Sequence, residues 1–142
     1  MLMPAAVLVL VILGSIAVDS AVVFLAQREL VNAAAAAAND AATSAIVDRS
    51  FYENGGAIVL DQTRATQVAA TSIAASQPQG LTLQGAPVVN VAGAAVCVEL
   101  TARVHHIFAH AIPGVAHDTT VSARASATAV GGAAVPQANV CP

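Results

Sequence analysis

Four histidines within a short stretch of the chain are the first candidates for metal chemistry. They are His105, His106, His110 and His117. His106 and His110 stand four residues apart, and neutral imidazoles are common zinc ligands. The surrounding alternation, however, predicts a strand on which His105 and His106 face opposite sides. It also places His110 and His117 in the turn that follows. We therefore expect solvated or capping histidines, with no metal site and no cofactor.

The chain carries none of the common catalytic motifs. It has no phosphate-binding P-loop, no HExxH, no GxSxG and no carboxylates paired at a useful spacing. Charged residues make up only 9% of the sequence, and the net charge is −3. The arginines are scattered rather than gathered into a basic patch, which argues against nucleic acid as a partner. The sequence therefore predicts a protein that is not an enzyme and does not bind nucleic acid.

The two cysteines, Cys97 and Cys141, are candidates for a disulfide. They do not form a CxxC pair, and no further cysteine could complete a metal site with them. An even number of cysteines in an exported chain favours a bridge. Cys97 falls on the outward face of a predicted strand, where a C-terminal tail could cross it. The other interpretation is one buried thiol and one thiol in the tail.

The N-terminal part of the chain is apolar enough to span a membrane. Residues 4–18 contain no charge, and after Asp19 and Ser20 the apolar run resumes over residues 21–26. A spanning helix needs about 20 predominantly apolar residues. We therefore expect residues 1–26 to form a transmembrane anchor.

A cleaved signal peptide is the alternative to the anchor. Residues 5–13 would be its apolar region, and Ser15-Ile16-Ala17 resembles a cleavage site. No basic residue precedes the apolar run, and the run resumes after Ala17, so we favour the anchor. Met1 and Met3 stand so close to the run that the native start can lie upstream. Cleavage would release a secreted binding module with no anchor.

Asp19 is the one ionisable residue inside the apolar run. A charge at the centre of a bilayer costs about 3 kcal/mol or more, and such residues often have a function. Three roles are open to it: its carboxylate could reach the lipid headgroups, be protonated, or contact a partner helix in an assembly.

A helical stalk is predicted to continue the anchor over residues 27–50. Apolar residues recur there at spacings of three and four, which is typical of one helix face. Alanine is the best helix former, and neither Gly nor Pro follows until Gly55-Gly56 ends the helix. The alanine stripe is flat, so a partner helix or the sheet of the chain's own domain can come close. The candidates for assembly contacts are Asp19, Ala26, Ala34, Ala37 and Ala41.

The remainder, residues 51–142, is predicted to be a small α+β domain. Asp61 is a good N-cap for a second helix that ends near residue 75. Period-two alternation then predicts strands over residues 94–106 and 119–130, with shorter strands at 81–83 and 87–91. Pro113-Gly114 marks the turn between the two long strands. The expected fold is a long N-terminal helix, a second helix and a small antiparallel sheet whose apolar face packs on helix.

The N-terminal segment resembles the TadE/TadG-like family, the pilin-like, membrane-anchored proteins of the bacterial tight-adherence (Flp) pilus system. The resemblance rests on the apolar span that runs into Val18-Asp19, on Arg28 nine positions later, and on Leu30-Val31-Asn32-Ala33-Ala34 before the alanine-rich helix. Residues 121–129 resemble the last strand of that group.

This resemblance implies a structural role. It implies a pilin-like, single-pass membrane subunit or assembly factor with an extracytoplasmic C-terminal domain, incorporated in a cell-surface pilus. Its partners would be other pilus subunits, met through the N-terminal helix, and the membrane. The family has no catalytic residue that could be carried over to this chain.

Overall fold

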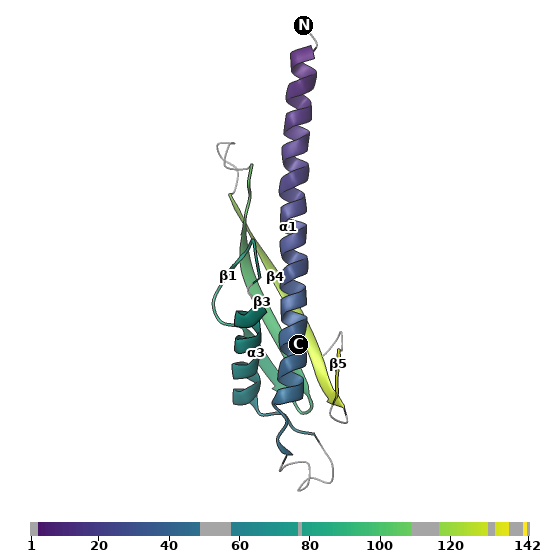
Figure 1. Ribbon diagram of the computed structural model, residues 1–142, viewed down its shortest axis with the longest axis vertical. Coiled ribbons are helices and arrows are strands. Elements are labelled where there is room, and N and C mark those ends of the chain that lie inside the picture. Colours follow the sequence, from purple (N-terminus) through teal and green to yellow (C-terminus); the bar gives the residue numbers. More distant parts are fainter. Residues whose placement is uncertain are drawn as a thin grey trace.

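One helix, α1 (Met3–Ser44), runs through most of the length of the molecule (Figure 1). We describe a computed structural model, in which residues 3–48, 58–76, 78–108, 117–130, 133–136 and 141 are placed. The 42 residues of α1 make a rod about 63 Å long at about 1.5 Å per residue. Its C-terminal half lies against a small sheet and a second helix, whereas its N-terminal end stands clear of them (Figure 1). The fold is α+β, as the sequence predicts.

The end of α1 comes earlier than the predicted stalk. The helix stops at Ser44 because the following backbone pairs with another segment. Asp61 N–H donates to Ala45 O at 2.9 Å, Val47 N–H donates to Val59 O at 3.1 Å, and Ile46 forms an isolated bridge with Leu60. The predicted breaker Gly55-Gly56 lies outside the described residues.

The second helix, α3 (Gln62–Ser76), begins where Asp61 predicts. Asp61 Oδ1 accepts from the N–H of Arg64 at 2.6 Å, which is the bond that an N-cap carboxylate makes to the first turn. Its apolar face, with Ala65, Ala69 and Ile73, is buried. Ser72 Oγ donates to Asp40 Oδ2 on α1 at 2.5 Å, so the two helices are also joined at their rim.

The sheet is antiparallel and has five strands: β1 (Thr82–Leu83), β2 (Val88–Ala92), β3 (Ala95–His105), β4 (Asp118–Val130) and β5 (Ala133–Pro136). β3 pairs with β4 along its full length, with residues 118–128 of β4. β1 and β2 both pair with the same edge of β3, β1 near its C-terminal end and β2 near its N-terminal end. The sequence did not predict β5, which pairs with the C-terminal end of β4. The predicted turn at Pro113-Gly114 lies outside the described residues.

The two-residue turn between β2 and β3 depends on glycine. Ala92 pairs with Ala95, so only Gly93 and Ala94 connect the strands. Gly93 has φ 62°, a conformation that glycine adopts without the steric penalty of a Cβ. Its carbonyl also accepts from Leu60 N–H at 3.1 Å, so the turn holds the segment that leads into α3.

The core lies between α1, α3 and one face of the sheet. β3 contributes three valines and a leucine to this core, and β4 contributes mainly alanines, as the alternation predicts. From α1 the core receives Leu30 and a set of alanines, and the alanines let the backbone approach closely. The α1 residues with 5% exposure or less are Ala26, Leu30, Ala33, Ala34, Ala37, Ala38, Ala41, Ala42 and Ala45. The predicted stalk is therefore an integral part of the domain's core.

Candidate membrane and assembly surface

The N-terminal part of α1, residues 4–18, exposes its apolar side chains on all sides. An 18-residue window of the helix has none of its residues buried, and the helix is long and apolar enough to cross a membrane. Burying one large apolar side chain is worth about 1.5–3 kcal/mol, so this surface strongly favours lipid or protein over water. The large side chains that it exposes are Val7, Leu8, Val9, Leu10, Val11, Ile12, Leu13, Ile16 and Val18.

Asp19 stands where this exposed segment meets the domain. Its Oδ1 accepts from the backbone N–H of Ile107 at 2.9 Å and from that of Phe108 at 3.1 Å. The carboxylate thus binds the end of the β3–β4 hairpin, a role that differs from the three suggested by the sequence. No pattern along the chain points to a contact across 88 residues, so sequence reasoning missed both partners.

The histidines lie at the same end of the sheet. His105 Nδ1 contacts Asp118 Oδ1, and His106 Nε2 lies 2.7 Å from Thr119 Oγ1. His106 N–H also donates to His117 O at 2.9 Å. These contacts join the ends of β3 and β4 across the hairpin. His110 lies outside the described residues, and among the residues that are described no three His, Cys, Asp or Glu side chains gather to hold a metal ion.

The alanines proposed for assembly have a different partner in the structure. Ala26 is 5% exposed, and Ala34, Ala37 and Ala41 are 0% exposed. α1 packs there against α3, β3 and β4, so a second subunit cannot reach these alanines while the domain is folded. The flat stripe is covered by the sheet and by α3 of its own chain. Of the proposed assembly positions only Asp19 lies at an accessible part of the helix.

Beyond Asp19, α1 exposes three further large apolar side chains. Phe24 is 65% exposed, Leu25 is 61% exposed and Val31 is 42% exposed. Arg28 and Glu29 are the first charged residues of the helix after Asp19. This exposed patch, Phe24, Leu25 and Val31, continues the surface of residues 4–18 alongside the domain.

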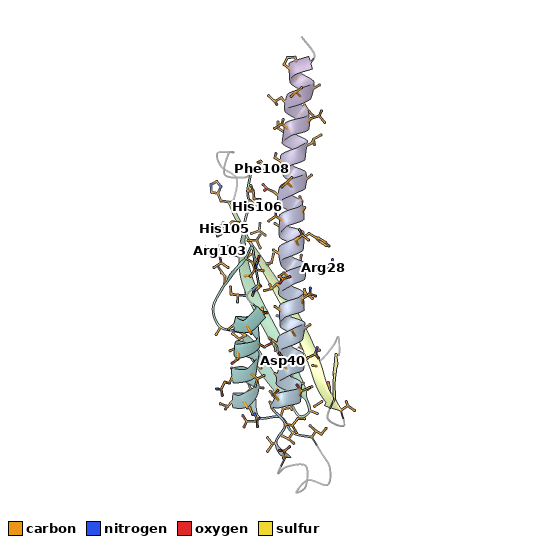
Figure 2. All side chains as sticks on the ribbon, in the orientation of Figure 1. Arg28, Asp40, Arg103, His105, His106 and Phe108 are labelled. Carbon is orange, nitrogen blue, oxygen red and sulfur yellow. A yellow bond between two sulfur atoms is a disulfide. The ribbon has the colours of Figure 1, made fainter. Side chains whose placement is uncertain are left out.

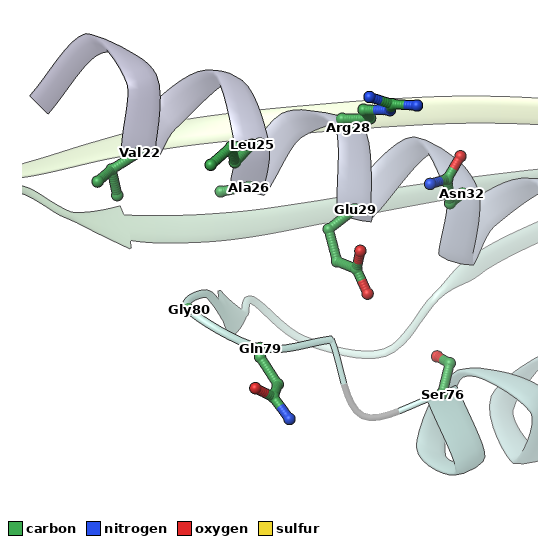
Figure 3. Close-up of a pocket in the computed structure, with 9 residues that line it drawn as sticks. All are labelled: Val22, Leu25, Ala26, Arg28, Glu29, Asn32, Ser76, Gln79 and Gly80. Carbon is green, nitrogen blue, oxygen red and sulfur yellow. The ribbon is translucent and has the colours of Figure 1, made fainter. Parts of the chain in front are cut away.

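A groove runs between α1 and the segment that follows α3 (Figure 3). Its volume is about 580 Å³. One end is apolar and the other is polar; Glu29 extends from α1 toward the side of the groove that carries Gln79 and Gly80 (Figure 3). The described lining offers no paired carboxylates, histidine or thiol for acid–base or nucleophilic chemistry. The lining residues are Val22, Leu25, Ala26, Arg28, Glu29, Asn32, Ser76, Gln79 and Gly80.

Cys97 and Cys141 form a disulfide on the opposite face of the sheet, with their Cα atoms 5.3 Å apart. Cys97 belongs to the set of β3 residues whose side chains point away from α1, yet it is only 4% exposed. Ser126, its partner across β3 and β4, is 8% exposed. The bridge therefore fixes a point of the C-terminal segment to the outer face of the sheet.

Comparison of the chain with protein-family models, with curated proteins and with solved structures finds no match.

Proposed function

We propose that this chain is a membrane-anchored structural subunit, or assembly factor, of a tight-adherence pilus. The observation that carries the proposal is the division of α1 into an apolar segment with no protein around it and an alanine-rich segment inside a folded core. Because both belong to one uninterrupted helix, the domain has a fixed direction relative to its anchor. The pilus system itself is inferred from the resemblance to TadE/TadG-like proteins.

The orientation follows from two considerations. Arg28 and Glu29 cancel as a positive-inside signal, so the charges beside the anchor do not choose a side of the membrane. The Cys97–Cys141 bridge favours an oxidising compartment, because disulfides rarely persist in the cytosol. The domain is therefore assigned to the extracytoplasmic side, in agreement with the family resemblance.

The contact with other subunits is assigned to the exposed patch of Phe24, Leu25 and Val31 and to the apolar segment above it. These side chains are large and exposed, unlike the alanines of the buried stripe. Contiguous apolar surface of this kind is typical of protein or membrane contacts. A neighbouring pilin-like helix would cover it without disturbing the domain.

The test is a double substitution, Phe24→Ser with Leu25→Ser, made in cells that also produce the other pilus components. Val130→Ser is the matched control, because Val130 is also exposed but lies at the far end of β4. We expect the double variant to form its disulfide and remain in the membrane, yet to lose co-purification with pilus subunits and piliation. Normal piliation and partner recovery in the double variant would contradict the assembly role.

The alternative, a secreted binding module, rests on where the domain contacts begin. Among the described residues, the hydrogen bonds from the β3–β4 hairpin to α1 are accepted by Asp19, so cleavage after Ala17 would leave them intact. Intact-mass measurement of the protein from its native membrane or medium separates the two functions. A soluble chain that begins at Val18 would favour the module, and a carbonate-resistant chain that retains residues 4–17 would favour the anchor.

A further inference from the structure

Directly after β3, the described part of the β3–β4 hairpin presents two large apolar side chains beside α1; we call these two residues, Ile107 and Phe108, the hairpin end. Ile107 is 59% exposed and Phe108 is 43% exposed, just beyond the last residue of β3. Neither side chain contributes to the domain's core. Figure 2 shows Phe108 above the rest of the sheet, on the side toward the N-terminal half of α1.

Asp19 determines the position along the axis of α1 at which Ile107 and Phe108 lie. The two N–H groups that its carboxylate binds belong to Ile107 and Phe108 themselves. The contacts of His105 with Asp118 and of His106 with Thr119 join the two strands directly below. Ile107 and Phe108 are therefore held at the level of Asp19 by hydrogen bonds from their own backbone.

The surface of α1 is still apolar at this level. The helix exposes Phe24 and Leu25 between Asp19 and its next charged residues, Arg28 and Glu29. Arg28 comes nine positions after Asp19, which is about 14 Å along a helix. A bilayer that surrounds the exposed apolar part of α1 would end near Arg28, so the hairpin end would lie on its lipid side.

Below Ile107 the sheet carries charge, first at the contact between His105 and Asp118 and then at Arg103. Arg103 precedes Ile107 by four residues, which is about 13 Å along an extended chain. Figure 2 shows Arg103 and Arg28 at nearly the same height, one on the sheet and one on α1. Both are exposed, and guanidinium groups bind lipid phosphates well. Two arginines at one level are suited to the headgroup layer.

We propose that Ile107 and Phe108 form a second membrane contact, in which these two side chains insert into the outer leaflet of the phospholipid bilayer that holds α1. The inference rests on the proposed membrane anchoring. It also gives Asp19 a physical role: the carboxylate accepts hydrogen bonds from two N–H groups that would otherwise lie unpaired near hydrocarbon. The domain would then stand on the membrane at two points, and its tilt relative to the bilayer would be restricted.

The chain contains no tryptophan, so a single introduced tryptophan reports its own surroundings. Three variants of the full chain, Ile12→Trp, Phe108→Trp and Val130→Trp, would be reconstituted in vesicles of phosphatidylcholine and phosphatidylglycerol at a ratio of three to one. Part of the phosphatidylcholine would carry bromine near the headgroup end of its acyl chains. Ile12→Trp reports on the anchor, and Val130→Trp is the control at the opposite end of the sheet. Disulfide formation and circular dichroism would verify that each variant is folded.

We expect blue-shifted, bromine-quenched emission from Ile12→Trp and Phe108→Trp, and unquenched emission from Val130→Trp. Quenching at Ile12 without quenching at Phe108 would overturn the second contact and leave the anchor standing. Blue-shifted emission at Phe108 that depends on protein density but not on bromine would assign the hairpin end to a second copy, and would also overturn it. Absence of quenching at Ile12 would overturn the anchor and the second contact together.

Discussion

The two halves of α1 are both apolar, but their side chains differ in size. In a water-soluble domain the larger side chains would be buried, whereas in α1 the larger side chains are the exposed ones. Residues 4–18 carry Leu, Ile and Val, and these are exposed; residues 26–45 carry mainly alanine, and one face of them is buried. In water the large side chains would be the ones to bury, because the stabilisation grows with apolar area. The difference shows that the surroundings of each half select its residues. The close-packed sheet and α3 accept mainly alanines and one leucine, Leu30, from α1, whereas the proposed lipid environment would accept large side chains on every face.

The sharpest way to test this comparison is to shorten one leucine in each half. Leu30 is fully buried, and Leu10 is 69% exposed. Leu30→Ala should lower the free energy of unfolding of the domain by about 3–5 kcal/mol, because the change leaves a cavity in a core that otherwise contains few large residues. Leu10→Ala should change it by less than about 0.5 kcal/mol.

Chemical denaturation of both variants in detergent micelles, followed by circular dichroism, gives the two values. Equal losses for Leu30→Ala and Leu10→Ala would show that the two halves are not in different surroundings under these conditions.

Removal of the disulfide should change the stability of the folded domain and leave membrane anchoring unchanged. It closes a loop with a sequence separation of 44, and its removal by Cys97→Ala with Cys141→Ala should lower the free energy of unfolding by about 3–4 kcal/mol in the chain-entropy model. Retention in the membrane after alkaline carbonate extraction should be unchanged, since the anchor does not depend on the sheet. Loss of the double variant into the soluble fraction would contradict that independence.

Replacing an alanine by leucine should have different effects on the buried and the exposed face of α1. Ala41 is fully buried between α1 and its neighbours, whereas Ala36 is exposed. Ala41→Leu should lower the free energy of unfolding by about 1–3 kcal/mol through overpacking. Ala36→Leu should be close to neutral, because leucine is nearly as good a helix former as alanine. A comparison of denaturation midpoints tests both predictions. An unchanged midpoint for Ala41→Leu would mean that Ala41 is not tightly packed against its neighbours.

Asp19 lies at the border between the two halves and should have the smallest effect. Asp19→Ala removes the acceptor for Ile107 N–H and Phe108 N–H, with an expected loss of about 1–2 kcal/mol. Asp19→Asn retains a carbonyl oxygen and should recover part of it. Amide hydrogen exchange should be faster at Ile107 and Phe108 in Asp19→Ala than in Asp19→Asn. Unchanged protection in both variants would show that the carboxylate does not hold the hairpin end.

The sequence pattern predicted those helices and strands that depend on residues close together in the chain. The N-cap at Asp61, the helical alanines and the alternation of the two long strands depend on residues within a few positions of one another, and the structure has each of them. The ends of elements were less predictable. α1 stops at Ser44 because Ala45 accepts from Asp61 N–H, and β5 forms because the edge of β4 is available to it.

The sequence by itself determined that α1 would be a long helix with an apolar end, that a sheet with one apolar face would follow, and that the flat alanine stripe would admit a close neighbour. Only the tertiary structure decided which neighbours those are, and they are the chain's own sheet and α3. It also brought Asp19 to Ile107 and Phe108. The reason is that periodicity specifies which face of an element is apolar, whereas its partner depends on how strands and helices distant in the sequence close around a common core.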